Sequence, residues 1–151
     1  FPQFKKELWD KARADARAAV KEDCTFKAVG SDINPECVEI ARAAAKRAGV
    51  DSMIDFFEAD ALDLTTGGVR GTVVTNPPYG ERMMEQHSAQ KLYAALGRHL
   101  KYANGWKQFV ITSEPEFEHY FGRRSDKKRK FYNGKIKCDY YMFTDNTRKK
   151  K

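Results

Sequence analysis

The residues best suited to chemistry form one octet, Thr75-Asn76-Pro77-Pro78-Tyr79-Gly80-Glu81-Arg82. It follows the β-branched run 71–75, which is typical of a buried strand. Two successive prolines cannot continue a strand, because neither has an N–H to donate. We therefore expect the strand to end at Asn76, in a stiff turn that presents an amide, two carbonyls and an aromatic ring.

This set of groups suits the exocyclic amine of a nucleobase. The side-chain carbonyl of Asn76 can accept one N–H, and the backbone carbonyl of Pro77 can accept the other. The fixed φ of proline makes that carbonyl a rigid acceptor. Tyr79 offers a face for base stacking, which is worth roughly 1–3 kcal/mol per base. The alternative is a structural turn with a packed tyrosine, but the position after a buried strand favours a site.

Two acids recur at equivalent places. Asp32 follows a predicted strand at 26–31, and Asp60 follows another at 53–58. Ligands of open α/β sheets bind at the carboxyl ends of strands, where an acid can bind both hydroxyls of a ribose. A capping or solvated aspartate is an equal alternative for Asp32, whereas the recurrence favours a site at Asp60.

The first half of the chain predicts a helix, a strand and a second helix. Apolar residues repeat every four positions over 4–20, which indicates a helix packed on a sheet. The second helix begins with Asn34 as N-cap and Pro35 in its first turn, and it ends at Gly49. Its expected apolar stripe comprises Cys37, Ala41, Ala44, Ala45 and Ala48. This strand–helix–strand order predicts a parallel, doubly wound α/β sheet.

The second half predicts further elements around the octet. A helix is expected from 88 to about 103, then a strand at 106–112 and a short helix from Pro115 to Gly122 that buries Phe117 and Phe121. Asn133-Gly134 predicts a hairpin turn between 128–132 and 135–144. The buried stripe of the long helix comprises Tyr93, Leu96, Leu100 and Ala103.

Charge favours a polyanionic partner. The formal net charge is +7, and a cluster of basic residues precedes the hairpin turn beside Phe131 and Tyr132. Such residues can follow an RNA backbone, or they can form a charged edge that prevents strand aggregation; the net charge favours RNA. The cluster comprises Arg123, Arg124, Lys127, Lys128, Arg129 and Lys130.

Composition excludes several classes of protein. The 151 residues fit one domain over 1–145 followed by a basic tail at 146–151. No apolar run is long enough for a membrane span. Three scattered cysteines suit a reducing cytoplasm rather than a disulfide framework or zinc site. The three histidines also lack ligand spacing, so no metal is expected.

The octet resembles motif IV of class I S-adenosyl-L-methionine (SAM) dependent amino-methyltransferases. Gly80-Glu81-Arg82 and the run 113–141 resemble one branch, the THUMP-associated rRNA guanine-N2 methyltransferases of the RlmL type. The resemblance covers nearly the whole chain. It implies a Rossmann-like class I methyltransferase sheet with a terminal antiparallel hairpin.

The resemblance also implies roles for single residues. Asp32, with Ile33 beside it, would bind the ribose of SAM. Asp60 would accept a hydrogen bond from the adenine amine, and the backbone of Ala61 would contact the ring edge. The motif residues would hold a flipped base for in-line attack, Asn76 also touching the cofactor. The catalytic residues implied by the resemblance are Asn76, Pro77, Pro78 and Tyr79. The residues expected to bind RNA, from the charge pattern, are Arg82, Arg123, Arg124, Lys128, Arg129 and Lys130.

One family feature is missing. These enzymes begin with a strand and an Asp/Pro/Cys/Gly-rich loop that holds the methionine end of SAM, and no such loop precedes Asp32. The sequence is thus expected to be a C-terminal piece, without the first strand and the upstream THUMP domain. The strands near 26 and 71 would lose the neighbour between them. Another segment or chain then fills that place, or the sheet is rearranged.

The expected function is methyl transfer to an exocyclic amine in RNA, guanine N2 of 23S rRNA. Two alternatives stay open. The same motif serves adenine-N6 methyltransferases of DNA. The chain could also be a non-catalytic basic RNA-binding fragment, which the absent SAM loop favours.

Overall fold

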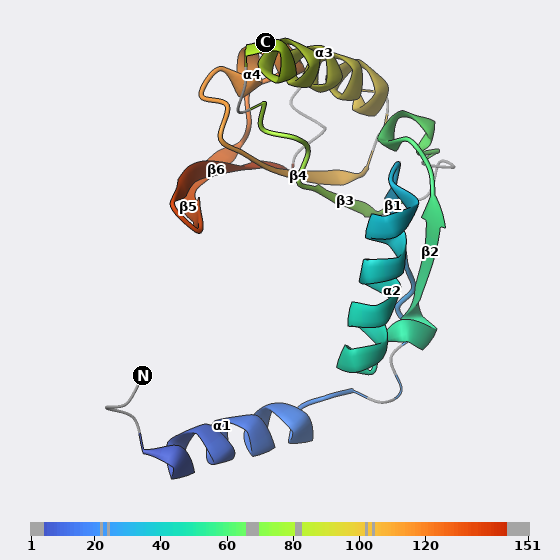
Figure 1. Cartoon of the computed structure of the whole chain (residues 1–151), viewed down its shortest axis with the longest axis vertical. Helices are drawn as coiled ribbons and strands as arrows, with labels where there is room; N and C mark the ends of the chain where they lie inside the picture. The colour runs from blue at the N-terminus through green and yellow to red at the C-terminus, as the bar shows by residue number, and fades with distance from the viewer. Residues whose placement is uncertain are drawn as a thin grey trace. The chain divides into compact units, whose positions relative to one another are not determined.

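Strands and helices alternate along most of the chain (Figure 1). The computed structural model describes residues 5–21, 23, 25–65, 70–80, 83–101, 103 and 105–144, without the side chains of 83 and 84. Among these residues, no helix is long and apolar enough to cross a membrane. The chain divides into two compact units, 1–58 and 59–151.

The first unit contains a parallel pair of strands. β1 (Ala28–Asp32) pairs with β2 (Ile54–Glu58), so that Asp32 lies opposite Glu58. The helix α2 (Pro35–Ala48) and the 3₁₀ turn η1 (Asp51–Met53) connect the two strands. This unit confirms the predicted strand–helix–strand order and the parallel pairing.

The ends of α2 follow from local sequence. The side chain of Asn34 accepts a hydrogen bond from the Glu36 amide at 2.9 Å, which satisfies one orphan donor of the first turn. Gly49 has φ of 70°, and the Val50 amide donates to the Ala45 carbonyl at 3.0 Å. These bonds form a Schellman cap, and they confirm both predicted ends of the helix.

The buried face of α2 differs from the predicted stripe. Val38 and Ala45 are buried, whereas Cys37, Ala44 and Ala48 are exposed. Alanines stand all along this helix, so their spacing alone cannot mark the buried face. Tertiary contact does so: Val38 is buried, whereas the larger Ile40 is 66% exposed.

The helix α1 (Lys6–Ala18) forms as predicted but does not pack as predicted. None of its residues is buried, and Leu8 and Trp9 are 58% and 47% exposed. The middle of its four-residue repeat is Ala12 and Ala16, which offer little area for burial. Within the first unit, the expected packing of this helix on a sheet is therefore wrong.

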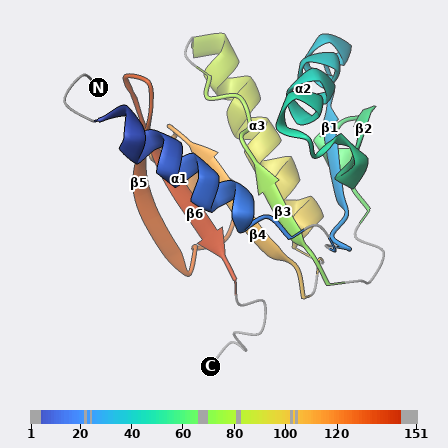
Figure 2. The same ribbon diagram turned by 90° about the horizontal axis from the view of Figure 1, so that it is seen from below.

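The second unit contains a four-stranded sheet in the order β3-β4-β6-β5 (Figure 2). β3 (Thr72–Thr75) and β4 (Lys107–Thr112) are parallel. β6 (Ile136–Phe143) is antiparallel to both β4 and β5 (Lys127–Asn133). The predicted parallel sheet with a terminal antiparallel hairpin is confirmed.

Two helices cover one face of this sheet (Figure 1). They are α3 (Met83–Leu100) and α4 (Phe117–Phe121). α3 begins at 83 rather than at the predicted 88, so that the exposed Glu85, Gln86 and His87 belong to the helix. A β-carbon on Gly97 of α3 would lie 2.0 Å from the carbonyl oxygen of Phe121, so the two helix backbones touch.

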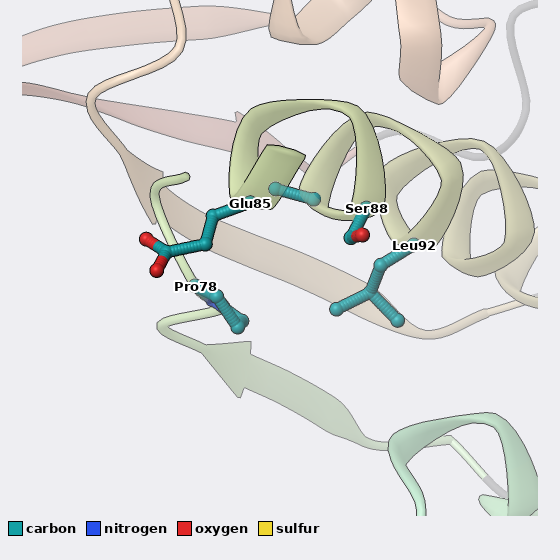
Figure 3. Close-up of a pocket in the computed structure, with 5 residues that line it drawn as sticks. Pro78, Glu85, Ser88 and Leu92 are labelled. Carbon is teal, nitrogen blue, oxygen red and sulfur yellow. The ribbon is translucent and has the colours of Figure 1, made fainter. Parts of the chain in front are cut away.

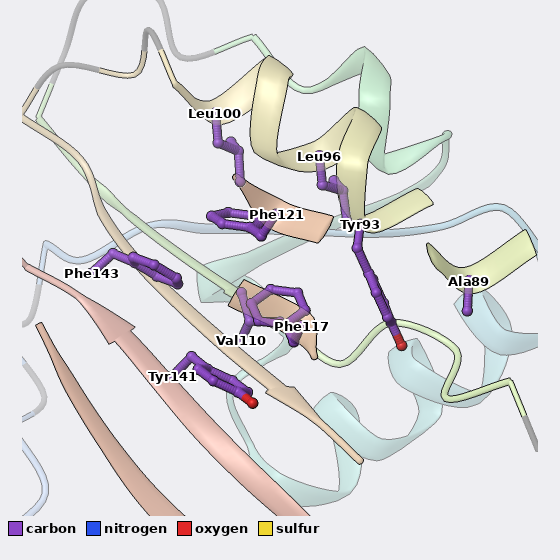
Figure 4. Packing of buried hydrophobic residues seen from close by; sticks show 9 residues of the cluster. All are labelled: Ala89, Tyr93, Leu96, Leu100, Val110, Phe117, Phe121, Tyr141 and Phe143. Atoms are coloured by element: carbon purple, nitrogen blue, oxygen red, sulfur yellow. The ribbon is translucent and has the colours of Figure 1, made fainter. Parts of the chain in front are cut away.

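Aromatic side chains fill the core between these helices and the sheet (Figure 4). The ring of Phe117 lies 5.2 Å from that of Tyr93 and 4.7 Å from that of Tyr141. The predicted stripe of α3 is confirmed, since Tyr93, Leu96, Leu100 and Ala103 are all buried. Aromatic contacts of this kind are each worth about 0.5–1.5 kcal/mol beyond area burial.

The start of β3 is fixed by an indole ring. A β-carbon on Gly71 would lie 2.6 Å from ring atoms of Trp106, so the ring lies directly on the backbone there. The Lys107 amide also donates to the Gly71 carbonyl at 3.0 Å. Both contacts hold the entry to β3 against the start of β4.

Two strand edges are open among the described residues. There β1 pairs only with β2, and β3 pairs only with β4. Val74 of β3 is 69% exposed. These edges belong to the two strands for which the sequence predicted a missing neighbour.

The hairpin turn lies one residue later than predicted. Asn133 pairs with Ile136, so Gly134 and Lys135 form the two-residue turn. Gly134 has φ of 62° while Lys135 does not have positive φ, which matches a type II′ turn with glycine at its first central position. Asn133 is therefore the last residue of β5, and its side chain is available for contacts elsewhere.

Candidate functional site

The motif turn directly follows β3, as predicted. In this turn Asn76 and Pro78 are exposed, whereas Pro77 is buried. Gly80 has φ of 69°, and a β-carbon there would lie 2.4 Å from the Cα of Gln86. Only glycine therefore fits where the turn passes against the first turns of α3.

Tyr79 reaches from this turn to the hairpin. The amide nitrogen of Asn133 donates to its hydroxyl at 3.4 Å, which links residues 54 positions apart. Partial burial, together with the nearby Cys138, raises the pKa of Tyr79 above its ordinary value, although hydrogen bonds with Asn133 and Asn76 lower it. The tyrosine thus stays neutral at physiological pH, with its hydroxyl anchored between the turn and β5.

The carbonyl of Pro78 points to the core. The hydroxyl of Tyr93 donates to it at 2.6 Å, and the Thr112 hydroxyl lies 3.0 Å from the same tyrosine oxygen. Burial is the main cause of the raised pKa of Tyr93. The sequence pattern places Tyr93 only in an apolar stripe. The signal that it misses is that a buried tyrosine needs a partner for its hydroxyl.

A pocket of about 380 Å³ lies between the turn and α3. In Figure 3, Pro78 lies across from the side chains that Ser88 and Leu92 project from the helix. Its lining is mainly apolar, and Glu85 and Ser88 add a carboxylate and a hydroxyl. The lining residues are Pro78, Glu85, Ser88, Ala89 and Leu92.

Asp60 belongs to the second unit, two residues beyond β2. One of its carboxylate oxygens accepts a hydrogen bond from the Leu62 amide at 2.8 Å and caps the 3₁₀ turn η2 (Ala61–Asp63). A carboxylate has lone pairs on both oxygens, so this cap leaves Asp60 able to accept from a ligand. Leu62 packs against the core beside α3.

Asp32 and Ile33 belong to the first unit. Asp32 ends β1, and its Oδ1 accepts from the Asn34 amide at 2.8 Å. Asp32 therefore does act as a capping residue, which was one of its two expected roles. Its second carboxylate oxygen remains available to accept a hydrogen bond from a ligand. Ile33 is 69% exposed and offers an apolar surface next to that acid.

The predicted RNA-binding residues fall into two groups. Arg123 lies 4.4 Å from the ring centroid of Phe143 and donates to Gln108, and burial lowers its pKa. Lys128 lies 3.4 Å from Asp139 and over the ring of Tyr141. These two side chains stabilise the sheet. Arg124, Arg129 and Lys130 are exposed.

Some predicted features lie outside the described residues. These are Arg82, Cys24 and the tail 146–151. Among the residues that are described, no cluster of three or more histidine, cysteine or acidic side chains could hold a metal ion.

The sequence matches a known family over residues 1–142, described as "RMKL-like, methyltransferase domain". "Putative RNA methyltransferase YpsC" of Bacillus subtilis is 36% identical over 95% of this chain and 37% of its own length. "Ribosomal RNA large subunit methyltransferase K/L" of Shewanella amazonensis is 39% identical over 91% of this chain and 20% of its own length. The chain thus spans well under half of these relatives.

Solved structures named as methylases or methyltransferases are also similar to this chain. A possible methylase from Clostridium difficile 630 has a TM-score of 0.83 at 38% identity, over 95% of this chain and 38% of that one. SMU.472, "a putative methyltransferase complexed with SAH", has a TM-score of 0.80 at 34% identity, over 94% and 38%. A predicted N6-adenine-specific DNA methylase from Listeria monocytogenes has a TM-score of 0.77 at 33% identity, over 94% and 36%. The fold is that of class I Rossmann-like methyltransferases, and the chain belongs to the RMKL-like methyltransferase domain family.

Proposed function

We propose that this domain transfers a methyl group from SAM to the exocyclic amine of a nucleobase in RNA, guanine N2 of large-subunit rRNA. The observation that carries the proposal is the rigid turn after β3, which exposes Asn76 and anchors Tyr79 by its hydroxyl. Relatives named as RNA methyltransferases support RNA as the substrate. Because the chain spans only part of those relatives, its own substrate has to be tested.

The residues of the second unit fit the adenine end of SAM. Pro78, Ala89 and Leu92 give the pocket apolar walls suited to a flat ring. The uncapped oxygen of Asp60 would accept the adenine amine, and the backbone of Ala61 would meet the ring edge. The homologue bound to S-adenosyl-homocysteine (SAH), the product left when SAM has given up its methyl group, supports this cofactor. When bound, SAM supplies an electrophilic methyl group.

In the first unit, the exposed Asp32 would bind the ribose hydroxyls through its remaining oxygen, with Ile33 beside it. Asp32 is the last residue of β1, and Ile33 follows it directly. A carboxylate at the end of a parallel strand is placed for such a contact. Loss of Asp32 should therefore weaken SAH binding.

The residues of the turn would orient the substrate nitrogen. Asn76 and Pro77 would each accept one N–H of the amine, so that its lone pair is free for in-line attack. The Pro78 carbonyl is already bound by Tyr93. Tyr79 would stack on the base. Positioning of this kind can supply roughly 7–11 kcal/mol of the barrier reduction.

The test is Asn76→Ala in the full-length protein. Methyl incorporation from tritiated SAM into a large-subunit rRNA transcript should be abolished, while SAH affinity measured by calorimetry stays nearly unchanged. Thr72→Ala is a matched control, because Thr72 is exposed at the opposite end of β3. Normal methylation by Asn76→Ala would show that the assignment is wrong.

Adenine-N6 methylation of DNA is a second candidate, favoured by the similarity to the Listeria methylase. The same protein is offered RNA and DNA of identical sequence, and the methylated nucleosides are identified after digestion. Methylguanosine from RNA supports the first proposal, and methyladenine from DNA supports the second. RNA binding without SAH binding would instead indicate a non-catalytic fragment.

A further inference from the structure

A line of buried hydrogen bonds ends at the Pro78 carbonyl. The backbone N–H of Glu114 donates to the hydroxyl oxygen of Thr112 at 3.2 Å. That oxygen lies 3.0 Å from the hydroxyl oxygen of Tyr93, which donates to the Pro78 carbonyl at 2.6 Å. Tyr93 and Thr112 are both 0% exposed, so solvent does not compete for the bond between their hydroxyls.

The direction of each bond follows from counting hydrogens. A carbonyl cannot donate, so the single hydroxyl hydrogen of Tyr93 goes to Pro78. Thr112 must then donate to Tyr93, and its oxygen accepts from Glu114. All three bonds therefore point toward Pro78, and bonds aligned in this way strengthen one another.

The far end of the line is firmly held. The carboxylate of Glu114 accepts from the Glu116 amide at 3.0 Å and from the Gln90 side chain at 3.2 Å. These two carboxylate bonds tie Glu114 to α3 and to the start of α4, which fixes the donor end of the line. The Glu114 carbonyl separately accepts from the Tyr141 hydroxyl at 3.3 Å, a bond that is not part of the line.

We infer that Tyr93 is a positioning residue, whose hydroxyl sets where the motif turn stands by holding the Pro78 carbonyl. This inference rests on the proposed function for its catalytic consequence. Two successive prolines fix φ at both positions, so few free torsions separate the Pro78 carbonyl from the acceptors on Asn76 and Pro77. Figure 4 shows Tyr93 reaching from α3 past Val110 and Phe117, with its hydroxyl at the far end.

The experiment compares two tyrosine variants of the full-length protein. Tyr93→Phe removes the hydrogen bond to the turn. Tyr141→Phe is the matched control, because Tyr141 is also 0% exposed, lies in the same core and donates to a backbone carbonyl that is not in the turn. Both variants should lower the thermal midpoint.

The two variants should differ in catalysis. With a large-subunit rRNA transcript and tritiated SAM, Tyr93→Phe should lower kcat about 10-fold or more, since small misplacements of reacting groups cost rate steeply. Its KM for RNA and its SAH affinity should stay unchanged. Tyr141→Phe should keep the wild-type kcat. Equal losses of kcat in both variants would overturn the inference.

A second readout does not depend on activity. Tyr79 and Gly80 carry the first backbone N–H groups after the two prolines, and their hydrogen exchange reports on the turn. Exchange should speed up in Tyr93→Phe and not in Tyr141→Phe. If the wild type methylates no RNA, the proposed function fails while exchange still decides this inference; equal exchange in both variants would refute it.

A third variant covers the case in which Tyr93→Phe does not fold. Thr112→Val keeps the shape of the threonine but removes its hydrogen bond to Tyr93. Compared with Tyr93→Phe, it should show smaller changes in the same direction: a lower kcat and faster hydrogen exchange at Tyr79 and Gly80. Wild-type values for both would count against the line of hydrogen bonds.

Discussion

At the residue scale, the turn depends on a glycine that no other residue can replace. We expect Gly80→Ala to destabilise the protein by more than the 1–2 kcal/mol or so that a left-handed conformation alone costs. The added methyl group would collide with the backbone of α3 at Gln86. Urea denaturation measures the change in the free energy of unfolding.

Gly122→Ala separates the two causes of that loss. Gly122 also has positive φ, at 75°, but open space surrounds the position of its β-carbon. This variant should show only the conformational cost. Equal destabilisation by both substitutions would mean that the contact with α3 contributes nothing.

Buried tyrosines predict loss of stability at alkaline pH. Burial raises the pKa of both Tyr93 and Tyr141 above the ordinary value of 10.0. Above about pH 10 the unfolded chain releases these protons while the folded protein keeps them, so stability falls as pH rises, by up to about 1.4 kcal/mol per pH unit for each tyrosine. Below that pH the contribution is fully present.

Urea midpoints measured at increasing pH, from about 9 to 11, test this prediction. Tyr141→Phe should fall less steeply than the wild type over that range, since it has one buried tyrosine fewer. Identical slopes would show that Tyr141 does not resist ionisation in the folded state.

The role of a single residue could be predicted where local sequence determines it, and not where tertiary packing does. Asn76, Tyr79 and Gly80 stand out in the sequence, because two prolines and a preceding strand dictate the turn locally. The bond from Tyr93 to Pro78 depends on how α3 crosses the sheet, and the sequence does not specify that. The contact of Asn133 with Tyr79 likewise required the exact register of the hairpin.

At the element scale, the contact between α3 and α4 reverses an ordinary trend. Gly→Ala inside a helix usually stabilises by about 1 kcal/mol. We expect Gly97→Ala to destabilise instead, because the new β-carbon would lie 2.0 Å from the Phe121 carbonyl oxygen. Thermal or urea unfolding gives the sign directly, and a stabilised variant would contradict the close packing of the two helices.

The ends of α2 were predicted better than its buried face. The caps of α2 depend on Asn34 and Gly49, whose side-chain and backbone preferences act within a few residues. The buried face of α2 depends on a partner surface, and its alanine-rich pattern allows several faces. Val38 was therefore missed, whereas the larger side chains of α3 marked its buried face correctly.

At the scale of the whole molecule, part of the positive charge lies on the exposed strand β5. All residues of β5 are exposed, including Arg129 and Lys130. Replacing both with glutamate should weaken RNA binding and reduce the dependence of affinity on salt, which scales at about −0.7 per phosphate neutralised. Filter binding over a range of salt concentrations measures both quantities.

The control for that experiment makes the same change of net charge elsewhere. Lys91→Glu with Lys107→Glu alters exposed residues of α3 and β4 in the same unit. Its salt dependence should remain close to that of the wild type. An equal decrease in both double variants would show that binding follows net charge alone and not the position of β5.

The sheet shows what sequence reasoning achieves for the whole chain. Strand–helix–strand order predicted parallel pairing, and the Asn-Gly pair predicted the hairpin, since both depend on short-range patterns. The resemblance implied a further strand beside β1 and β3, and among the described residues each of these two strands has one partner. The division into two units was not predicted, because composition and length describe the chain as a whole and not how its contacts are distributed.

That division has a practical consequence for spectroscopy. The chain has two tryptophans: Trp9 lies in the first unit, and Trp106, on the backbone of Gly71, lies in the second. A Trp9→Phe variant of these 151 residues would therefore carry a single tryptophan, Trp106, at the entry to the strand that bears the motif. Its emission gives a label-free optical reporter, able to follow cofactor titration or unfolding of that unit in real time.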